Sequence, residues 1–393
     1  MQNIENSEIG VANFYAAIGT QFIHFKVDLT KTTLQRSGSI ELGLNIQYVW
    51  RHPSLNIVYL VISNGGPGKA GSQNQLVACD LDATNGSIKS INNAVDLPHR
   101  PIHLSTDTAA KHLLIAYNNP CFISVHKIKA NGSIGSIVKQ KINLDDGIFG
   151  HQVMVTPNGS QAILICRGYD PDNVQAERPG ALKIFNYNDG KLFFKESIAP
   201  NQGFGFGARH LDFHPNGRWV YLAVERQSEL HLLHIKNGSI NSTIVQNVST
   251  LSKSIKFGVR QAVSAVHVHP SGNFVYISNR TYASNKHQAD NAIPYGEDNI
   301  AVLKINGHSG KVTPIQHCDT NGSLPRTFSI DPSGQILIAA NSENANKATK
   351  LGQVKQLPIS LNLFIIGLDG RLQQNGNIVF QGNNQSLFWA GFL

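Results

Sequence analysis

Residues 205 to 226, GFGARHLDFHPNGRWVYLAVER, decide the fold of this chain. Two apolar-rich runs, Leu211 to Phe213 and Trp219 to Val224, flank the tetrapeptide His214-Pro215-Asn216-Gly217. Proline fixes φ near the value that a turn needs, and glycine supplies the positive φ of a tight turn. Apolar runs on both sides of such a turn predict two antiparallel strands joined in a β-hairpin.

The same pattern of strand, turn and strand recurs along the chain. Close copies begin at residues 51, 155, 268 and 330, and a degraded copy covers residues 105 to 119. The copies read RHPSLNIVYLVISN, VTPNGSQAILICR, VHPSGNFVYISNR, IDPSGQILIAANS and STDTAAKHLLIAYNN. A period of roughly 50 to 60 residues lies in the range of propeller and solenoid repeats. The chain is therefore predicted to be an array of similar β units.

A second set of turns lies out of phase with the hairpins. Seven polar turns precede a β-branched residue or leucine, and they begin at Asn85, Asn131, Asp189, Asn237, Ser309, Asp369 and, without a glycine, Asp28. Only six hairpin turns lie inside the chain, so the seventh repeat must be divided between its ends. We expect residues 11–28 to supply three outer strands and residues 386–393 the inner one. Such closure leaves no exposed sheet edge.

These patterns predict an all-β fold, namely a seven-bladed β-propeller of four-stranded antiparallel blades whose ring is closed by the N- and C-terminal strands. The 35 glycines, the short alternating runs and the absence of apolar residues at helical spacing agree with this class. No linker and no shift in composition divides the chain, so we expect one domain over residues 1–393.

The composition restricts the possible partners. Charged residues make up only 15% of the chain, with a net charge of +8 and a pI of about 9.2. The basic residues are scattered, so we expect no nucleic-acid partner. The four cysteines are far apart, so neither a disulfide framework nor a metal site is expected, and no cofactor is implied. Neither a signal peptide nor a run that spans a bilayer is visible, so we expect a cytoplasmic protein without membrane contact.

The hairpins also predict which side chains meet at one end of the ring. In a hairpin with equal arms, residues equidistant from the turn lie side by side. The positions eight before and eight after the turn glycines at 159, 217, 272 and 334 are all polar: His151, Arg167, Arg209, Glu225, Ser264, Arg280, Arg326 and Ser342. Because the hairpin turns lie at the opposite side of the ring, we expect these residues around one mouth of a central channel. Singly, such residues more often form salt bridges between blades; together they suit an anion and an acid/base group.

Three of the repeats resemble those of a known family. The stretches Ala208 to Glu225, Ala265 to Arg280 and Pro325 to Asn341 are similar to repeats of the lactonase-type seven-bladed β-propellers, as is the opening Phe14-Tyr-Ala-Ala-Ile-Gly. That family includes bacterial propeller-type 6-phosphogluconolactonases and eukaryotic carboxy-muconate lactonizing enzymes. The resemblance spans essentially the whole chain and implies the same propeller fold.

The resemblance also implies a catalytic cluster of a histidine, an arginine, a glutamate and a second arginine. The matching positions are His151, Arg209, Glu225 and Arg280, which the hairpin spacing also selects. In the hydrolysis of a sugar δ-lactone, Glu225 is the candidate general base, and His151 could deliver the proton to the leaving oxygen. The two arginines would hold the glutamate, the anionic group of the substrate and the developing oxyanion.

An alternative assignment of the base stays open. Flanking arginines lower the pKa of a carboxyl group and weaken it as a base. If Glu225 only orients the arginines, His151 becomes the base. Four further residues are expected to bind the substrate: Arg167, Ser264, Arg326 and Asn341.

Three segments depart from the family pattern and leave from the same end of the blades, namely residues 168–179, 281–298 and 342–357. They are either ordinary loop variation or a partial lid. If they form a lid, segments 168–179 and 281–298 would each bring polar side chains toward a ligand. The candidates are Tyr169, Arg178, His287, Tyr295 and Glu297.

Three functions remain open from the sequence. The first is hydrolysis of an anionic sugar lactone such as 6-phosphogluconolactone, which the basic balance and the arginines favour. The second is a cycloisomerase acting on a carboxy-muconate, a narrower group. The third is a non-catalytic propeller that binds an anionic ligand or a protein partner, because this fold serves many roles. In the first two cases the partner is a small anionic substrate, and the protein is a monomer or a weak homo-oligomer.

Overall fold

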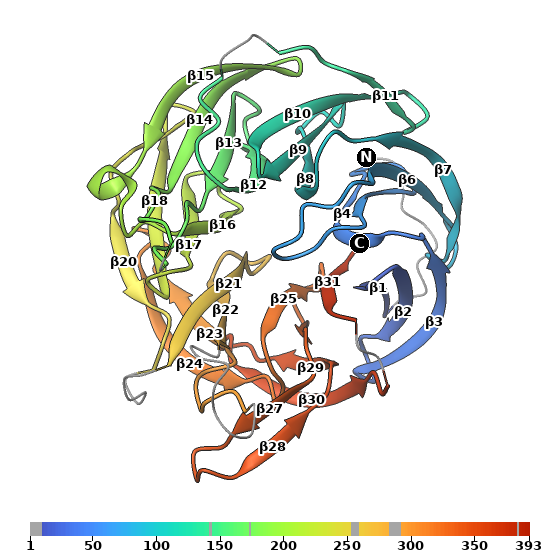
Figure 1. The fold of residues 1–393 in the computed structure, drawn as a ribbon. Coiled ribbons are helices and arrows are strands. Elements are labelled where there is room, and N and C mark those ends of the chain that lie inside the picture. Colours follow the sequence, from blue (N-terminus) through green and yellow to red (C-terminus); the bar gives the residue numbers. More distant parts are fainter. Residues whose placement is uncertain (1–9, 141–143, 173, 253–258, 283–291, 383–384) are drawn as a thin grey trace.

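Seven antiparallel sheets stand in a ring in the computed structural model, which describes residues 10–140, 144–172, 174–252, 259–282, 292–382 and 385–393 (Figure 1). The sheets have four strands each, except for blade 4, which has five. The predicted seven-bladed propeller is confirmed. The one helical segment in the described residues is the short η1 (Pro200–Gly203), and no helix there has the length and hydropathy needed to cross a membrane.

The blades follow one another along the chain. Blade 1 contains β4 (Asn45–Arg51), β5 (Ile57–Ser63), β6 (Asn74–Leu81) and β7 (Ile88–Asp96). Blade 2 contains β8 (Pro101–Thr106), β9 (His112–Asn118), β10 (Cys121–Ile128) and β11 (Ile134–Ile137). Blade 3 contains β12 (Gly150–Val155), β13 (Gln161–Cys166), β14 (Ala181–Asn188) and β15 (Lys191–Ile198). Blade 4 contains β16 (Ala208–Phe213), β17 (Trp219–Val224), β18 (Glu229–Lys236), β19 (Ser239–Ile240) and β20 (Gln246–Ser249).

The remaining blades include one extra hairpin. Blade 5 contains β21 (Arg260–Val268), β22 (Phe274–Tyr282), β23 (Asn299–Ile305) and β24 (Val312–Asp319). Blade 6 contains β25 (Pro325–Ile330), β26 (Ile336–Asn341), β29 (Ser360–Ile366) and β30 (Leu372–Val379). The hairpin of β27 (Ala345–Ala348) and β28 (Val354–Leu357) projects from blade 6.

Blade 7 is assembled from both ends of the described chain. Its inner strand is β31 (Leu387–Phe392), which pairs with β1 (Val11–Ile18), and β2 (Gln21–Asp28) and β3 (Thr33–Glu41) follow outward (Figure 1). The predicted closure is confirmed. The prediction that residues 11–28 hold all three outer strands was wrong, because that stretch turns once at Gly19 and forms only two strands.

Both sets of predicted turns connect strands as expected. In blades 1 to 6 the hairpin turns join the inner strand to the second strand. In the turn at residues 214–217, the N–H of Gly217 donates to His214 O at 2.9 Å, and Gly217 has φ +68°. The outer turns join the third strand to the fourth. Four buried tyrosines of second strands donate a hydroxyl to an outer-turn glycine of the next blade: Tyr15 to Gly86, Tyr59 to Gly132, Tyr221 to Gly310 and Tyr276 to Gly370.

The apolar core lies between the blades. Seven clusters of buried side chains are present among the described residues, one for each pair of neighbouring blades. Second strands are covered on both faces, so β5, β13, β17 and β26 are buried along their whole length. This burial explains why these strands read as continuous apolar runs rather than alternating ones.

Every inner strand carries a β-bulge. In each blade the ladder between the inner and second strands changes register once, at Gln47, Ile102, His151, Arg209, Ser264–Ala265, Arg326 and Phe388. A bulge re-aims a side chain away from the alternating pattern of its strand. A small cavity within the ring is lined by one bulge residue of every blade, with Ala265 representing blade 5. We call these seven positions the bulge ring.

The bulges correct the spacing rule used on the sequence. Arg209 was expected beside Glu225, but the regular ladder ends with Ala208 paired to Val224. In blade 5, Arg280 pairs with Ala262 instead of Ser264. The pairing prediction was wrong because the hairpins are not centred on the turn glycine and because each bulge inserts a residue.

Candidate active site

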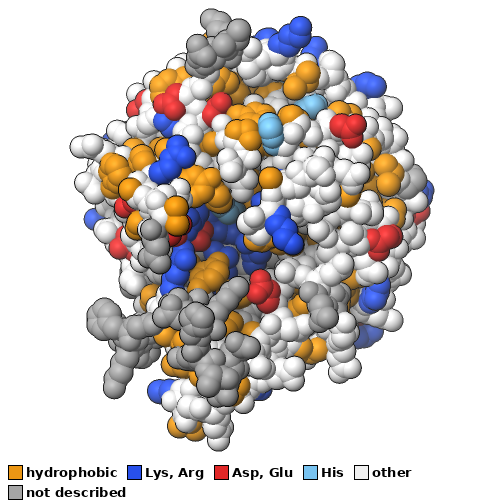
Figure 2. Space-filling model, viewed as in Figure 1, with side chains coloured by type: hydrophobic (Ala, Val, Ile, Leu, Met, Phe, Trp, Pro, Cys, Tyr) orange, Lys and Arg blue, Asp and Glu red, His pale blue; other side chains and the backbone are white. Residues whose placement is uncertain are grey.

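A cavity of about 460 Å³ lies at one mouth of the ring. Six of the eight residues that the hairpin spacing selected line it: His151, Arg167, Arg209, Glu225, Arg280 and Arg326. They come from blades 3, 4, 5 and 6, so residues far apart in the sequence meet here. Figure 2 shows basic side chains gathered in a hollow near the middle of the molecule.

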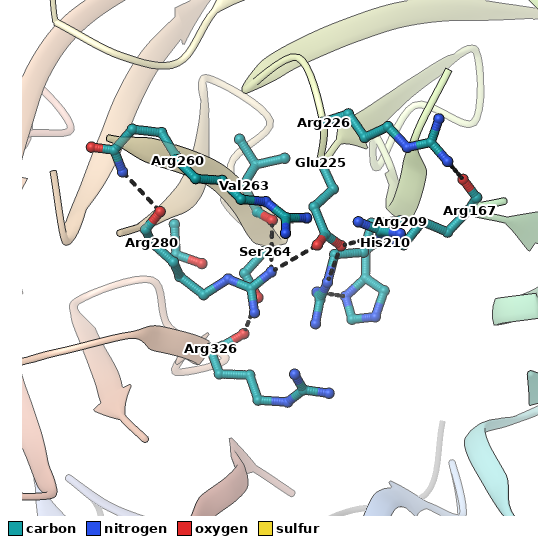
Figure 3. A network of polar contacts seen from close by, with 12 residues as sticks. Arg167, Arg209, His210, Glu225, Arg226, Arg260, Val263, Ser264, Arg280 and Arg326 are labelled. Carbon is teal, nitrogen blue, oxygen red and sulfur yellow. Dashed lines mark hydrogen bonds and ion pairs between the residues drawn. The ribbon is translucent and has the colours of Figure 1, made fainter. Parts of the chain in front are cut away.

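Glu225 lies among three guanidinium groups. Its Oε2 is 3.3 Å from Arg167 Nε and 3.2 Å from Arg209 Nε. Its Oε1 is 3.6 Å from Arg280 Nη2, and Figure 3 shows the carboxylate between Arg209 and Arg280. The exposed fractions of Arg209, Arg280 and Glu225 are 2%, 3% and 7%. The cluster is therefore held in a largely desolvated place, where charges interact strongly.

The strand ends fix the backbone of this cluster. Arg209 is the bulge residue of β16, and Glu225 directly follows β17, where its N–H donates to Gly207 O at 2.6 Å. Arg280 lies within β22, and its Nη2 donates to Val263 O at 3.1 Å. Arg167 directly follows β13, and its N–H donates to Phe149 O at 2.9 Å. The fold therefore fixes the positions of these charged residues before a substrate binds.

The arginines decide the protonation of Glu225. Burial raises the pKa of its carboxyl group, but Arg167, Arg280 and Arg209 together lower it further, to about 2. The carboxylate is therefore ionised at neutral pH and is a weak base. Its geometry is that of a group that positions guanidiniums.

His151 is the bulge residue of β12 and faces the same cavity. Burial, followed by Arg209, Arg326, Arg167 and Arg280, lowers the pKa of His151 well below its ordinary value. Its Nδ1 has no hydrogen-bond partner among the described residues. A neutral imidazole beside the arginines is available to accept a proton.

Two further histidines lie behind His151, and the spacing rule did not select them. The His151 and His210 rings are 4.9 Å apart between centroids, and the His210 and His103 rings are 6.0 Å apart. Arg209 Nη1 donates to His210 Nδ1 at 3.3 Å. His210 directly follows Arg209, the bulge residue of β16. An alignment of the repeats that allowed for the bulge would have placed His210 next to the cavity.

The segment of residues 168–179 supports the cluster from outside. Asp170 Oδ2 is 2.7 Å from Arg167 Nη2 and 2.6 Å from Arg260 Nη2, and Asp170 Oδ1 is 2.5 Å from Arg226 Nε. Tyr169 lines the cavity, whereas Arg178 does not and lies over the Tyr169 ring at 5.7 Å from its centroid. This segment therefore contributes an ion-pair anchor as well as part of the cavity wall.

The other two long segments are joined to each other. Lys347 Nζ pairs with Asp298, and Ile293 forms a bridge with Lys347. Glu297 accepts hydrogen bonds from the N–H and hydroxyl of Ser252 at distances of 2.7 to 3.1 Å, so its carboxylate is occupied. Tyr295 is exposed and is not part of the cavity wall. His287 lies outside the described residues.

Two residues expected to bind substrate do not line the cavity. Ser264 is fully buried and donates its hydroxyl to Arg326 O at 2.5 Å. Asn341 is also fully buried, and its Nδ2 lies 3.1 Å from both Thr320 O and Ser360 Oγ. Both side chains satisfy neighbouring strands, as buried polar groups must. Ser342, the eighth residue of the spacing rule, donates to Leu324 O at 2.8 Å.

Other lining residues were not singled out from the sequence. They are Gly66, Pro67, Gly68, Lys69 and Ala70 between β5 and β6, together with Arg100, Ile102, Asn118, Asn119, Phe149 and Tyr282. The segment between β5 and β6 reaches over the centre of the ring (Figure 1). It is an insertion within blade 1, so the repeat pattern gave no reason to place it here. Within the described ranges, no group of three or more His, Cys, Asp or Glu side chains is placed to hold a metal ion.

The fold and the cavity together define a propeller with a cationic, histidine-bearing site at one mouth. Residues 10–351 match the family model described as "Lactonase, 7-bladed beta-propeller". The chain belongs to this lactonase family, as its repeats predicted.

Named relatives cover most of the chain. The 6-phosphogluconolactonase of Bacillus subtilis is 27% identical over 366 residues, 90% of this chain and 95% of the relative. The 6-phosphogluconolactonase of Formosa agariphila is 24% identical, with 87% and 93% covered. The periplasmic gluconolactonase of Pseudomonas aeruginosa has a TM-score of 0.72 at 16% identity, with 98% and 99% covered. A Lactobacillus plantarum structure has the same TM-score at 21% identity and the same coverage. The two solved structures show the shared fold.

Proposed function

We propose that the protein hydrolyses an anionic sugar lactone, 6-phosphogluconolactone, in the cavity at the mouth of the ring. The observation that carries the proposal is the composition of the cavity wall. Six basic side chains, one carboxylate and a neutral histidine line it: Lys69, Arg100, Arg167, Arg209, Arg280, Arg326, Glu225 and His151. Such a wall attracts an anion and also offers donors to an oxyanion. The names of the relatives from B. subtilis and F. agariphila agree with this substrate.

The reaction consumes one water molecule: its hydroxyl group is added to the carbonyl carbon, and a proton is given to the leaving ring oxygen. The oxygen of water bonds to the lactone carbonyl carbon, and the carbonyl electron pair moves onto oxygen. Arg209 directs Nε to Glu225 and Nη1 to His210, which leaves Nη2 to donate to this oxyanion. When the tetrahedral intermediate collapses, the bond from carbon to the ring oxygen breaks, and that oxygen takes a proton. The product is an open-chain hydroxy acid.

We assign the proton transfer to His151 and the positioning of the arginines to Glu225. The carboxyl pKa of about 2 makes Glu225 a poor proton acceptor at neutral pH. Burial first and the arginines second depress the pKa of His151, so an anionic substrate that offsets the arginine charges raises this pKa. Substrate binding thus makes His151 a stronger proton acceptor.

The test is hydrolysis of freshly generated 6-phosphogluconolactone at near-neutral pH, corrected for spontaneous ring opening. We expect rapid turnover by the wild type and a loss of about two or more orders of magnitude in Glu225→Gln and Arg280→Ala. Arg371→Ala, on an exposed outer turn, is the control and should keep the wild-type rate. No acceleration by the wild type would remove this substrate and favour a muconate or a binding role.

A further inference from the structure

The cations of the cavity are unevenly paired. Arg167, Arg209 and Arg280 share the carboxylate of Glu225. Within the described part of the chain, no carboxylate oxygen lies within 4.0 Å of a side-chain nitrogen of Lys69, Arg100 or Arg326. We call the part of the cavity wall formed by Lys69, Arg100 and Arg326 the cationic half, because none of these three side chains forms an ion pair with another described residue.

Arg100 is built into the cationic half. Its side chain is only 5% exposed, and its Nε donates to Gln47 Oε1 at 2.9 Å. Burial and the nearby charge of Arg326 lower the pKa of Arg100 to about 10. A buried guanidinium without a counterion is costly, and removal of a partner from such a charge is strongly destabilising. The buried guanidinium of Arg100, unpaired within the described chain, is therefore suited to bind an anionic ligand.

Arg326 presents its edge to the same half. Its guanidinium carbon lies 4.0 Å from the centroid of the Phe388 ring, so one face of the group is covered by an aromatic side chain. A stacked guanidinium keeps its planar N–H fork free for the oxygens of a phosphate. Arg326 and Phe388 both belong to the bulge ring, and both side chains face the channel.

Lys69 lines the same cavity as Arg100 and Arg326. It lies on a tight turn in which Gly66 and Lys69 pair, and its side chain is exposed. Gln47 Nε2 lies 3.5 Å from Gly65 O, at the base of the same turn, while Gln47 Oε1 accepts from Arg100. One bulge residue thus contacts both the turn and the buried arginine.

We propose that Lys69, Arg100 and Arg326 bind the phosphate group of the substrate, while Arg209 and Arg280 serve the lactone. This assignment rests on the proposed function for the identity of the substrate. Phosphate suits the cationic half because its charge is greatest where no carboxylate competes. Two carboxylates, Glu225 and then Glu343, oppose the lowering of the pKa of Arg326 by burial without forming an ion pair with it; Glu343 lines a small neighbouring cavity with Arg326 but not the main one. The three residues therefore set the preference for a phosphorylated lactone.

The experiment compares kcat/KM for 6-phosphogluconolactone and for glucono-δ-lactone in Lys69→Ala, Arg100→Gln and Arg326→Gln. We expect each arginine variant to lower the ratio of the two values by about 10- to 100-fold, mainly through KM, and Lys69→Ala to lower it less because its cation is exposed. Arg51→Gln, at the opposite mouth, is the matched control and should keep the ratio. An unchanged ratio in both arginine variants would overturn the assignment.

Calorimetric titration with 6-phosphogluconate and gluconate separates the two proposals. The wild type should bind the phosphorylated acid more tightly, and the arginine variants should lose that advantage while thermal unfolding stays cooperative. If the wild type hydrolyses neither lactone but shows this difference, the proposed reaction fails and the phosphate site stands. Equal affinity for the two acids in the wild type overturns the phosphate site, whether or not turnover occurs.

Discussion

Glu225 illustrates how burial and charge compete at a single residue. Burial alone favours a protonated carboxyl group, the state that a general acid needs. Three guanidiniums within 3.6 Å reverse this, so the pKa falls to about 2. Truncating such a group leaves cations unpaired, which costs more than the loss of one ion pair. Loss of activity in Glu225 variants therefore does not identify it as the base, and His151 has to be tested separately.

Chemical rescue tests His151 directly. His151→Ala should lose about two orders of magnitude in lactone hydrolysis. Added imidazole should restore part of the rate, because it fits the space of the missing ring and accepts the same proton. Formate, which supplies a carboxylate, should not. The rate of imidazole-catalysed opening without protein is subtracted; a lack of rescue above it would contradict the assignment to His151.

At the scale of elements, the two sets of turns and the second strands form one repeated latch. Tyr221, fully buried in β17 of blade 4, donates to Gly310 O at 2.7 Å in the outer turn of blade 5. The same contact recurs at three other blade interfaces in the described chain, at Tyr15, Tyr59 and Tyr276. An outer turn therefore does more than connect two strands: the carbonyl group of its glycine also accepts a hydrogen bond from a tyrosine of the neighbouring blade.

Tyr221→Phe removes one latch while keeping the ring. The Gly310 carbonyl then loses its buried donor, so we expect the free energy of unfolding to fall by about 1 to 3 kcal/mol. Urea unfolding followed by fluorescence measures the change. Tyr295→Phe, at an exposed side chain, is the control. Equal stability of the two variants would mean that water replaces the tyrosine at no cost.

The elements were more predictable than their register. Strands and turns follow from composition at short range, so the repeat of residues 205–226 located all seven blades and the shared blade 7. A bulge adds one residue without a distinctive residue type, so spacing placed Arg209 at the correct mouth and near Glu225, with which it forms an ion pair, but in the wrong ladder register. Lys69 and Arg100 escaped detection because the first lies in an insertion and the second in a connection between blades.

For the whole molecule, buried titrating groups couple stability to pH. Burial is the largest cause that lowers the pKa of seven histidines: His24, His52, His103, His126, His151, His210 and His267. Such groups bind more protons when unfolded, so their stabilising contribution is complete above about pH 6.5 and is lost as pH falls toward 4. Asp146, Asp212 and Asp298 act in the opposite direction, because burial raises their pKa values, to about 7 for Asp146 and about 6 for Asp212.

Because the seven histidines outnumber these three aspartates, the protein should be less stable at pH 5 than at pH 7. We expect a lower urea midpoint at pH 5. His103→Gln should reduce this loss by up to about 1.4 kcal/mol per pH unit, since the pKa of His103 is about 3 in the folded state. His99→Gln changes an exposed ring and should reproduce the wild-type difference. A stability that rises on acidification would contradict this balance.

The bulge ring has a consequence for how such a protein diversifies. Its seven side chains contribute to neither the regular ladder nor, for most of them, the cores between blades. A substitution there leaves the regular ladder intact, whereas the same substitution one residue away falls in a packed strand. Evolution and engineering thus have seven positions, one on each blade, at which point mutations can change the side chains that face the channel.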